Sequence, residues 1–247
     1  MRVIVCGASG RMGRKLISLI NDGFNGASLA AAVDIVKGDE DNFYTDIADV
    51  TEQADVIIDF SHPSAFEGIL NYAKMRKIPL VIAATGHTEA QREAAKAAAA
   101  EIPVFMSGNM SIGVAVLCEF AKKAAALFPD ADVEIVEVHH RNKIDVPSGT
   151  ALMLANAVKE ARGGELNIGR HVNGKRKDGE IGIHSLRTGA VIGEHEVRID
   201  TGSETIILKH QSHGRELFGE GALCAASFIS VLDSGFYTIS DMIGRKC

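Results

Sequence analysis

The sequence lacks an excess of positive charge. Its 26 Lys and Arg residues are outnumbered by 32 Asp and Glu residues, the formal net charge is -6, and there is no long basic run. Proteins that bind nucleic acid need clustered Lys and Arg to neutralise phosphates. We therefore do not expect nucleic acid as a partner.

Long apolar runs are also missing. None approaches the ~20 residues that cross a bilayer as a helix. Residues 2–6 (RVIVC) have the pattern of a strand, unlike a charged leader followed by an apolar stretch and a cleavage site. We expect a cytoplasmic protein with no membrane contact.

Paired cysteines are absent as well. Cys6, Cys118, Cys224 and Cys247 are scattered, and no two of them form a CxxC pair. This spacing favours neither a disulfide framework nor a thiolate metal site, and it predicts buried or isolated thiols. The chain also lacks an internal repeat. Its 247 residues, 46% hydrophobic and 23% charged, are typical of one large or two small globular domains.

The amino-terminal half alternates short apolar runs with helical patterns. Continuous apolar strands separated by helices are typical of a parallel sheet that is covered on both faces. The predicted strands are residues 2–6 (RVIVC), 29–33 (LAAAV), 55–60 (DVIIDF), 80–84 (LVIAA) and 103–106 (PVFM).

Two helix starts are expected in this half. Residues 64–67 (SAFE) and 88–91 (TEAQ) both fit a capping box, in which a hydroxyl accepts a bond from the third helical amide. The alanine-rich residues after the second box predict a helix.

A glycine fingerprint follows the first predicted strand. GASGRMG places Gly7, Gly10 and Gly13 between a strand and a helix, where they allow a tight turn and close approach to a pyrophosphate. Asp34 lies at roughly the offset expected of a ribose-binding acid. Together these features predict a dinucleotide site. Asp34 favours NADH, whereas Lys37 could pair with a 2′-phosphate, so we expect both NADH and NADPH to be used.

The carboxyl-terminal half has a different pattern. Alternating residues in DVEIVEV, AVIGEHEVRID and ETIILKHQS predict half-buried strands, and DTGS predicts a hairpin turn between the last two. A helix is expected from about Ser148. The apolar residues 219–235 predict a closing helix that could return to the first domain.

The segment EVHHRNKIDVPSGTA combines several polar features. His139 and His140 stand at the expected end of a strand, and Ser148 begins a helix whose positive end would carry the amides of Gly149 and Thr150. A histidine can donate a proton near neutrality, and Lys143 adds positive charge. Asp145 is expected to orient the loop or pair with Lys143. Zinc is disfavoured because adjacent strand residues point to opposite faces, and we expect no metal.

GASGRMG and EVHHRNKIDVPSGTA together resemble the 4-hydroxy-tetrahydrodipicolinate reductase (dihydrodipicolinate reductase) family of the diaminopimelate route to lysine, over nearly the whole chain. The resemblance implies an α/β chain with a Rossmann-type parallel-sheet dinucleotide-binding domain at residues 1–110 and 215–247. It implies an α+β substrate-binding and tetramerisation domain with a mainly antiparallel sheet at residues 111–214. The implied reaction is NAD(P)H-dependent reduction of a cyclic, unsaturated dicarboxylate, by a homotetramer.

The resemblance also implies roles for single residues. His139 and Lys143 would be catalytic, His140, Gly149 and Thr150 would bind the substrate, and Arg187 and Arg215 are weaker candidates. The cofactor-binding residues that it implies, together with Asp34 from the strand offset, are Gly7, Ala8, Ser9, Gly10, Arg11, Met12, Asp34, Ala83, Ala84, Thr85, Ser107, Gly108, Asn109 and Met110.

One segment departs from the family pattern. Residues 83–86 read Ala-Ala-Thr-Gly where the family commonly has Gly-Thr-Thr-Gly, so one hydroxyl that would face the cofactor is missing. Two other functions remain open: a different two-domain nicotinamide-dependent dehydrogenase, and a sensor that binds the dinucleotide without turnover.

Overall fold

The computed structural model describes residues 1–38 and 41–244. The chain forms two compact units. Unit 1 consists of Met1–Ile112 and Arg215–Cys247, and unit 2 consists of Gly113–Gly214. In the described part, no helix is both long enough and apolar enough to cross a membrane.

Unit 1 contains a seven-stranded sheet in which every pairing is parallel, in the order β12-β6-β5-β4-β1-β2-β3. This confirms the predicted Rossmann-type sheet. Its strands are β1 (Arg2–Cys6), β2 (Ser28–Val33), β3 (Phe43–Tyr44), β4 (Val56–Asp59), β5 (Leu80–Ile82), β6 (Pro103–Met106) and β12 (Gly235–Tyr237). The short outer strands β3 and β12 were not predicted, because two or three residues carry too little pattern.

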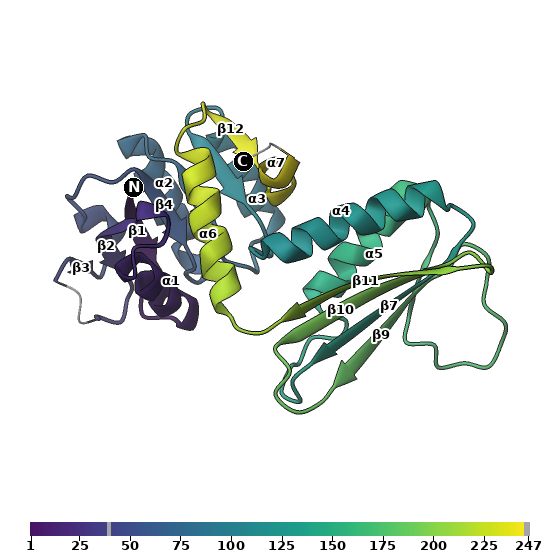
Figure 1. Ribbon diagram of the computed structural model, residues 1–247. Coiled ribbons are helices and arrows are strands. Elements are labelled where there is room, and N and C mark those ends of the chain that lie inside the picture. Colours follow the sequence, from purple (N-terminus) through teal and green to yellow (C-terminus); the bar gives the residue numbers. More distant parts are fainter. Residues whose placement is uncertain (39–40, 245–247) are drawn as a thin grey trace. The chain divides into compact units, whose positions relative to one another are not determined.

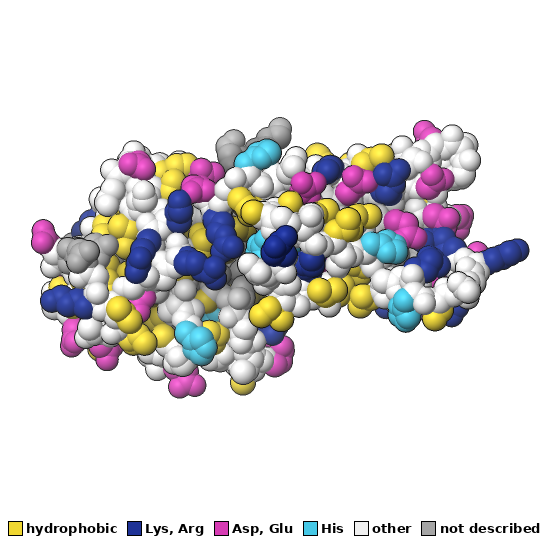
Figure 2. Space-filling model, turned by 90° about the horizontal axis from the view of Figure 1, so that it is seen from below, with side chains coloured by type: hydrophobic (Ala, Val, Ile, Leu, Met, Phe, Trp, Pro, Cys, Tyr) yellow, Lys and Arg dark blue, Asp and Glu magenta, His cyan; other side chains and the backbone are white. Residues whose placement is uncertain are grey.

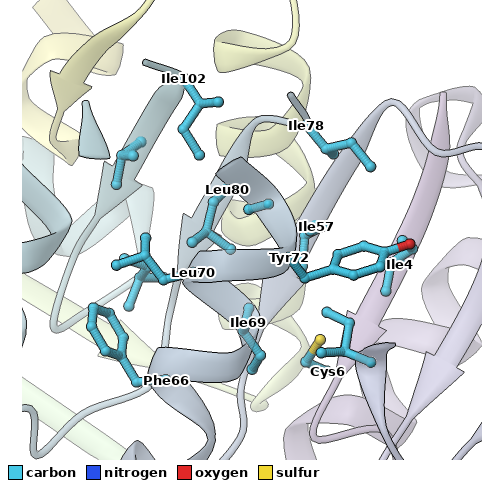
Figure 3. Close-up of a cluster of buried hydrophobic side chains, with 14 of the residues drawn as sticks. Ile4, Cys6, Ile57, Phe66, Ile69, Leu70, Tyr72, Ile78, Leu80 and Ile102 are labelled. Carbon is cyan, nitrogen blue, oxygen red and sulfur yellow. The ribbon is translucent and has the colours of Figure 1, made fainter. Parts of the chain in front are cut away.

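Helices cover this sheet and bury its apolar strands. The close-up in Figure 3 shows side chains of β1, β4 and β5, such as Ile4, Ile57 and Leu80, beside Ile69 and Leu70 of helix α2; all belong to one buried cluster. The helices of unit 1 are α1 (Arg11–Asn21), α2 (Phe66–Arg76), α3 (Glu89–Ala98), α6 (Glu216–Ile229) and α7 (Ile239–Gly244), with 3₁₀ turns η1 (Phe24–Gly26), η2 (Ile47–Asp49) and η3 (Pro63–Ala65).

The two predicted capping boxes have different outcomes. Thr88 caps α3: its hydroxyl accepts a bond from the Gln91 amide, and the Gln91 side chain accepts one from the Thr88 amide. The box at Ser64 is wrong. Pro63 begins η3 there, the His62 ring accepts a bond from the Ser64 amide, and α2 starts only at Phe66.

Helix α6 packs against α1 within unit 1, and both are seen side by side in Figure 1. Lys15 and Glu216 form an ion pair of 2.5 Å between these helices. A Cβ atom at Gly219 would lie 2.8 Å from the Leu19 side chain, and one at Gly221 would lie 1.7 Å from the Met110 carbonyl. The two glycines therefore allow the returning helix to lie close to the rest of unit 1.

Unit 2 contains a five-stranded sheet in the order β11-β10-β7-β9-β8. The β11–β10 and β10–β7 pairings are antiparallel, and the predicted hairpin joins β10 to β11. The β7–β9 and β9–β8 pairings are parallel; helix α5 lies in the connection between β7 and β8, and a loop joins β8 to β9. The elements are α4 (Ile112–Leu127), β7 (Asp132–His139), α5 (Gly149–Arg162), β8 (Leu166–Ile168), β9 (Ile181–Arg187), β10 (Gly193–Asp200) and β11 (Thr205–Ser212).

Helices α4 and α5 lie on one face of this sheet (Figure 1). Leu117 and Ala121 of α4 and Leu154 and Val158 of α5 share a buried cluster with Val133, Ile135, Ile181, Ile183, Val197 and Ile199 of the strands. The face of the molecule drawn in Figure 2 mixes side chains of both charges with scattered hydrophobic ones.

Candidate active site

The carboxyl end of β1 leads into the glycine turn of unit 1. Gly7 has φ 77°, and a Cβ atom there would lie 2.7 Å from the backbone of Phe60 and Ser61. A Cβ atom at Gly13 would lie 2.1 Å from the Gly7 carbonyl oxygen. Only glycine therefore fits these two positions. The first amides of α1, at Arg11 and Met12, lie at the positive end of the helix, where phosphates bind.

Asp34 follows β2 and faces this turn. Its carboxylate accepts bonds from the Ser9 amide at 3.0 Å and from the Val36 amide at 3.3 Å. The Ser9 hydroxyl donates to the Val36 carbonyl at 2.6 Å. Asp34 thus ties the end of β2 to the turn after β1, which fixes the carboxylate at the edge of the sheet.

A pocket of about 450 Å³ opens beside Gly7, Gly10 and Asp34. Most of its lining comes after β4 and around β3, and these residues were not predicted from the sequence. Part of this lining could have been predicted, because it follows the carboxyl end of the predicted strand at residues 55–60 and ligands bind at that edge of a parallel sheet. The further lining residues are Cys6, Val33, Ile35, Thr45, Asp46, Ile47, Phe60, Ser61, His62, Ser64, Ala65, Gly68 and Ile69.

These features fit a dinucleotide. The turn has no side chain at Gly7 and Gly10, and helix α1 begins directly after it. The carboxylate of Asp34 lies at the end of the neighbouring strand β2. The pocket wall is largely apolar, as the adenosine end of a cofactor requires. Gly7 to Met12 and Asp34 would hold the pyrophosphate and the ribose of such a cofactor.

The remaining predicted cofactor residues follow β5 and β6 at the same edge but do not line this pocket. Ala83, Ala84 and Thr85 come directly after β5, and the Ala83 amide donates to the Asp59 carbonyl at 2.9 Å. After β6, the Ser107 hydroxyl donates to the Asn109 carbonyl at 2.7 Å. Gly108 and Met110 belong to the same loop.

In unit 2, one face of the sheet changes from apolar to polar along its strands. On β7, Val133 and Ile135 belong to the buried cluster, and the next two residues on that face are Glu137 and His139. On β10, Ile199 and Val197 belong to the cluster, and His195 and Gly193 share their face. The register places His195 opposite Glu137 and, on β9, Arg187 opposite His139. Pairing thus gathers polar groups that are distant in sequence.

Glu137 lies at the centre of this group and is fully buried. Arg187 donates to both of its oxygens, at 2.9 Å and 3.0 Å, and the Ser148 amide donates at 3.2 Å. Its Oε2 also contacts Nδ1 of His139. Burial alone would raise the pKa of Glu137, but the bonds from His139 and Arg187 hold this pKa well below its usual range.

His195 lies beside His139, with the two rings edge to face and their centroids 5.1 Å apart. Its Nε2 is 3.1 Å from the hydroxyl of Ser148, which caps α5 by accepting a bond from the Ala151 amide. Burial and the neighbouring His139 lower the pKa of His195 to about 4, so its ring is neutral at pH 7. Neither Glu137 nor His195 was predicted from the sequence as a site residue.

The loop between β7 and α5 carries the other predicted residues of this segment. Lys143 pairs with Asp145 at 2.8 Å, as expected, and this bond lowers the pKa of Asp145. The His140 carbonyl accepts a bond from the Lys143 amide at 3.1 Å. Gly149 and Thr150 form the first turn of α5, and a Cβ atom at Gly149 would meet nothing within 4 Å.

The two weaker arginine candidates lie in different units. Arg187 is engaged with Glu137 and with the Asp145 carbonyl, at 2.7 Å. Arg215 stands at the start of α6 in unit 1. Within residues 1–38 and 41–244, no three His, Cys, Asp or Glu side chains form a group that could hold a metal ion. Cys6, Cys118 and Cys224 are free thiols, and Cys247 lies outside the described residues.

Known proteins resemble this chain over its full length. The 4-hydroxy-tetrahydrodipicolinate reductase of Clostridium novyi (strain NT) is 39% identical over 251 residues, and that of Caldanaerobacter subterraneus subsp. tengcongensis is 40% identical over 255 residues; 99% of each chain is covered in both comparisons. The solved structure of a dipicolinate-bound dihydrodipicolinate reductase from Paenisporosarcina sp. TG-14 matches with a TM-score of 0.81 and 25% identity, covering 96% of this chain and 97% of that one.

Family models agree with these relatives. The model for the dihydrodipicolinate reductase N-terminus matches residues 1–110, and the model for its C-terminus matches residues 113–243. With a glycine turn and pocket in unit 1 and a buried Glu137–His139 pair in unit 2, the chain belongs to the dihydrodipicolinate reductase family.

Proposed function

We propose that this chain catalyses the NAD(P)H-dependent reduction of 4-hydroxy-tetrahydrodipicolinate to tetrahydrodipicolinate, a step of lysine biosynthesis through diaminopimelate. The observation that carries the proposal is the placement of His139 at the end of β7, bonded to a buried carboxylate and close to the start of α5. Full-length relatives named for this activity support it.

The two units have separate tasks. Unit 1 binds the dinucleotide at the glycine turn and Asp34, and unit 2 binds the substrate and forms the contacts between copies. When bound, the reduced nicotinamide supplies the hydride. The protein residues bind and orient the reactants and provide the proton.

His139 acts as the general acid. Hydride addition to a conjugated ring leaves negative charge on the substrate, and a positioned donor quenches it. Nδ1 of His139 is occupied by Glu137, so the other ring nitrogen, Nε2, gives the proton.

Lys143 and the start of α5 bind the carboxylates of the substrate. The lysine supplies a formal positive charge, while Gly149 and Thr150 lie at the positive end of the helix. The Paenisporosarcina relative was solved with dipicolinate, a cyclic dicarboxylate, which supports this class of ligand.

Asp34 and Lys37 set the choice of cofactor. The carboxylate favours the ribose hydroxyls of NADH and repels an added phosphate, whereas the exposed Lys37 can pair with the 2′-phosphate of NADPH. We therefore expect both cofactors to work, with NADH at least equal. The ratio of the two kcat/KM values measures this, and a marked preference for NADPH would contradict it.

The protein assembles as a homotetramer in the cytoplasm, where reduced nicotinamide is available. Support comes from the face of the unit 2 sheet that lies opposite α4 and α5. Its Leu186 and Ile207 are 47% and 49% exposed in the single chain, and contact with another copy would remove this apolar surface from water.

A coupled assay tests the function. The substrate is generated freshly by the preceding enzyme, and the loss of reduced nicotinamide absorbance is followed. Turnover only with an unrelated substrate would indicate another two-domain dehydrogenase. Binding of NADH without turnover of any substrate would indicate a dinucleotide sensor.

A further inference from the structure

The buried carboxylate of Glu137 is not needed to bind a ligand, since protein groups use both of its oxygens. Oε1 accepts bonds from the Ser148 amide at 3.2 Å and from Arg187 at 2.9 Å. Oε2 accepts one from Arg187 at 3.0 Å and contacts Nδ1 of His139. A group with no exposed surface and this many partners acts through its neighbours.

We propose that Glu137 is a positioning residue, which fixes the His139 ring with Nδ1 protonated and leaves Nε2 as the nitrogen that gives up the proton. This inference rests on the proposed function of His139. An ionised carboxylate can only accept hydrogen bonds, so the ring nitrogen that contacts it must carry a hydrogen. Such a partner sets both the tautomer and the orientation of a histidine.

Arg187 holds the carboxylate in place. Its guanidinium group is planar and makes a bidentate contact with Glu137, which is directional. Arg187 also donates to the Asp145 carbonyl, and this bond connects β9 to the loop before α5. The Ser148 amide holds Oε1 from the start of α5. Contacts from β9, from the loop before α5 and from the start of α5 therefore fix the direction in which Oε2 faces His139.

The other titratable groups around the pair come from β10, β11 and the loop. His195 of β10 lies edge to face on His139 and stays neutral at pH 7 because burial lowers its pKa to about 4. His210 of β11 stands opposite His195 in the register, and burial lowers its pKa too. Lys143 and Asp145 on the loop pair with each other. Glu137 is thus the carboxylate that contacts the His139 ring.

The geometry on the other side of the ring agrees with this role. A Cβ atom at Gly193 would lie 3.1 Å from Nε2 of His139. The glycine therefore leaves space at the nitrogen opposite the one that Glu137 holds. A ring held from the Nδ1 side and uncrowded at Nε2 is suited to donate from Nε2.

A purely structural role for Glu137 is the alternative, and the same strand offers a control. Glu134, three positions earlier on β7, contacts Arg176 and Nε2 of His184, the latter at 2.8 Å. Glu134→Gln removes a comparable carboxylate with histidine and arginine partners, but it leaves His139 untouched. Glu137→Gln keeps the size of the side chain and removes its charge, and Glu137→Asp restores the charge.

The experiment combines two readouts on the full-length protein. The first is nitrogen NMR of histidine-labelled protein without substrate, with His139 assigned through His139→Gln. Wild type should show a protonated Nδ1 at His139. In Glu137→Gln the share of rings with a protonated Nδ1 should fall, because an amide side chain can present an N–H instead of an oxygen to this nitrogen.

The second readout compares kcat with the substrate KM. In Glu137→Gln, kcat should fall at least about tenfold but less than the ~10²–10⁴-fold typical of losing a general acid. The substrate KM should change little, because Glu137 does not bind the substrate. Glu137→Asp should recover part of the kcat and of the wild-type tautomer, and Glu134→Gln should match wild type in both.

Each failure has its own meaning. If wild type is active but Glu137→Gln shows the wild-type kcat and the wild-type His139 tautomer, the positioning role is wrong while the proposed function stands. If wild type does not reduce the substrate, the proposed function is wrong, and the His139 tautomer in the NMR spectra still decides the Glu137–His139 link. If Glu137→Gln does not fold, a wild-type His139 with an unprotonated Nδ1 would overturn the proposal.

Discussion

At the scale of single residues, His139 and His140 are neighbours in sequence but differ in surroundings. His139 is 7% exposed and contacts Glu137, whereas His140 follows the end of β7 and is only half-buried. We expect His139→Gln to lower kcat by ~10²–10⁴-fold with little change in the substrate KM, since a proton donor acts mainly in the transition state. Steady-state kinetics with saturating NADH measures this.

His140→Gln is the matched control. His140 is proposed to bind the substrate, so this substitution should raise the substrate KM more than it lowers kcat. Near-normal kcat in His139→Gln together with loss of activity in His140→Gln would mean that the two roles are exchanged.

Lys143 should behave differently from His139. If Lys143 binds the dicarboxylate as proposed, its removal weakens both the binding of the substrate and its alignment, so Lys143→Ala should raise KM and lower kcat. In the double variant with His139→Gln, the fold-loss of kcat/KM should be smaller than the product of the two single fold-losses, because both groups are proposed to serve one step.

NADH affinity, followed by fluorescence titration, should be the same in Lys143→Ala as in wild type, since the proposed cofactor-binding residues belong to unit 1. A weakened NADH affinity in this variant would argue against that division of tasks.

At the scale of secondary structure elements, the start of α3 offers a test of capping. Thr88→Ala removes a hydroxyl that accepts the Gln91 amide, and such losses cost about 1 kcal/mol of stability. Ser64→Ala is the control, because Ser64 lies in η3 and caps no α-helix. Urea unfolding should show a lower midpoint for Thr88→Ala and a change within about 0.5 kcal/mol for Ser64→Ala. Equal losses would contradict the assignment.

The capping pair also shows what local sequence can predict. The strands β1 and β6 have the bounds expected from their apolar runs, and Thr88 has the expected partners. The prediction at Ser64 is wrong because Pro63 fixes a 3₁₀ turn ahead of the helix. Helix α4 was not predicted at all, since its residues are apolar on most sides and lack a clear helical stripe.

The candidate site was predictable only where its residues are contiguous. The glycine turn and the segment 139–150 could be identified because each is a single motif. Glu137 resembles any alternating residue of a half-buried strand, and His195 comes from β10 with no local signal. Strand pairing brings them together, and neither register nor the parallel β7–β9 pairing can be read from one strand alone.

At the scale of the whole molecule, stability should decline in mild acid. The pKa of His195 is about 4 in the folded protein, against 6.5 ordinarily, because of burial and the nearby His139. Between these values the unfolded chain binds the extra proton, so the free energy of unfolding falls as pH falls from 6.5 to 4. The contribution of the neutral His195 ring to the free energy of unfolding is complete above pH 6.5 and amounts to about 3 kcal/mol at most.

Urea unfolding at several pH values between 7 and 4 measures this. The variant His195→Asn should show a shallower pH dependence than wild type, whatever its stability at pH 7. Burial also lowers the pKa of His87, so part of the pH dependence of stability should remain in both wild type and His195→Asn. Identical slopes would show that His195 takes up its proton normally in the folded state.

Assembly is the second expectation at this scale. Light scattering at micromolar concentration should report a mass near four chains, and a monomer would contradict the proposed tetramer. Ile207→Lys places a charge on the exposed face of β11 and should lower the mass. Thr201→Lys, in the turn before β11, should leave the mass unchanged.

The polar end of the unit 2 sheet has one more consequence. Glu137, His139 and His195 occupy buried positions in line with Val133, Ile135 and Val197, where hydrocarbon would pack well. Replacing a buried ion pair by apolar residues of similar volume is often neutral or stabilising. Thermal stability therefore favours apolar residues at these positions, whereas the proposed catalysis requires the polar ones. Laboratory selection for thermal tolerance alone should enrich apolar replacements of Glu137 together with Arg187, and the surviving proteins should be robust but inactive.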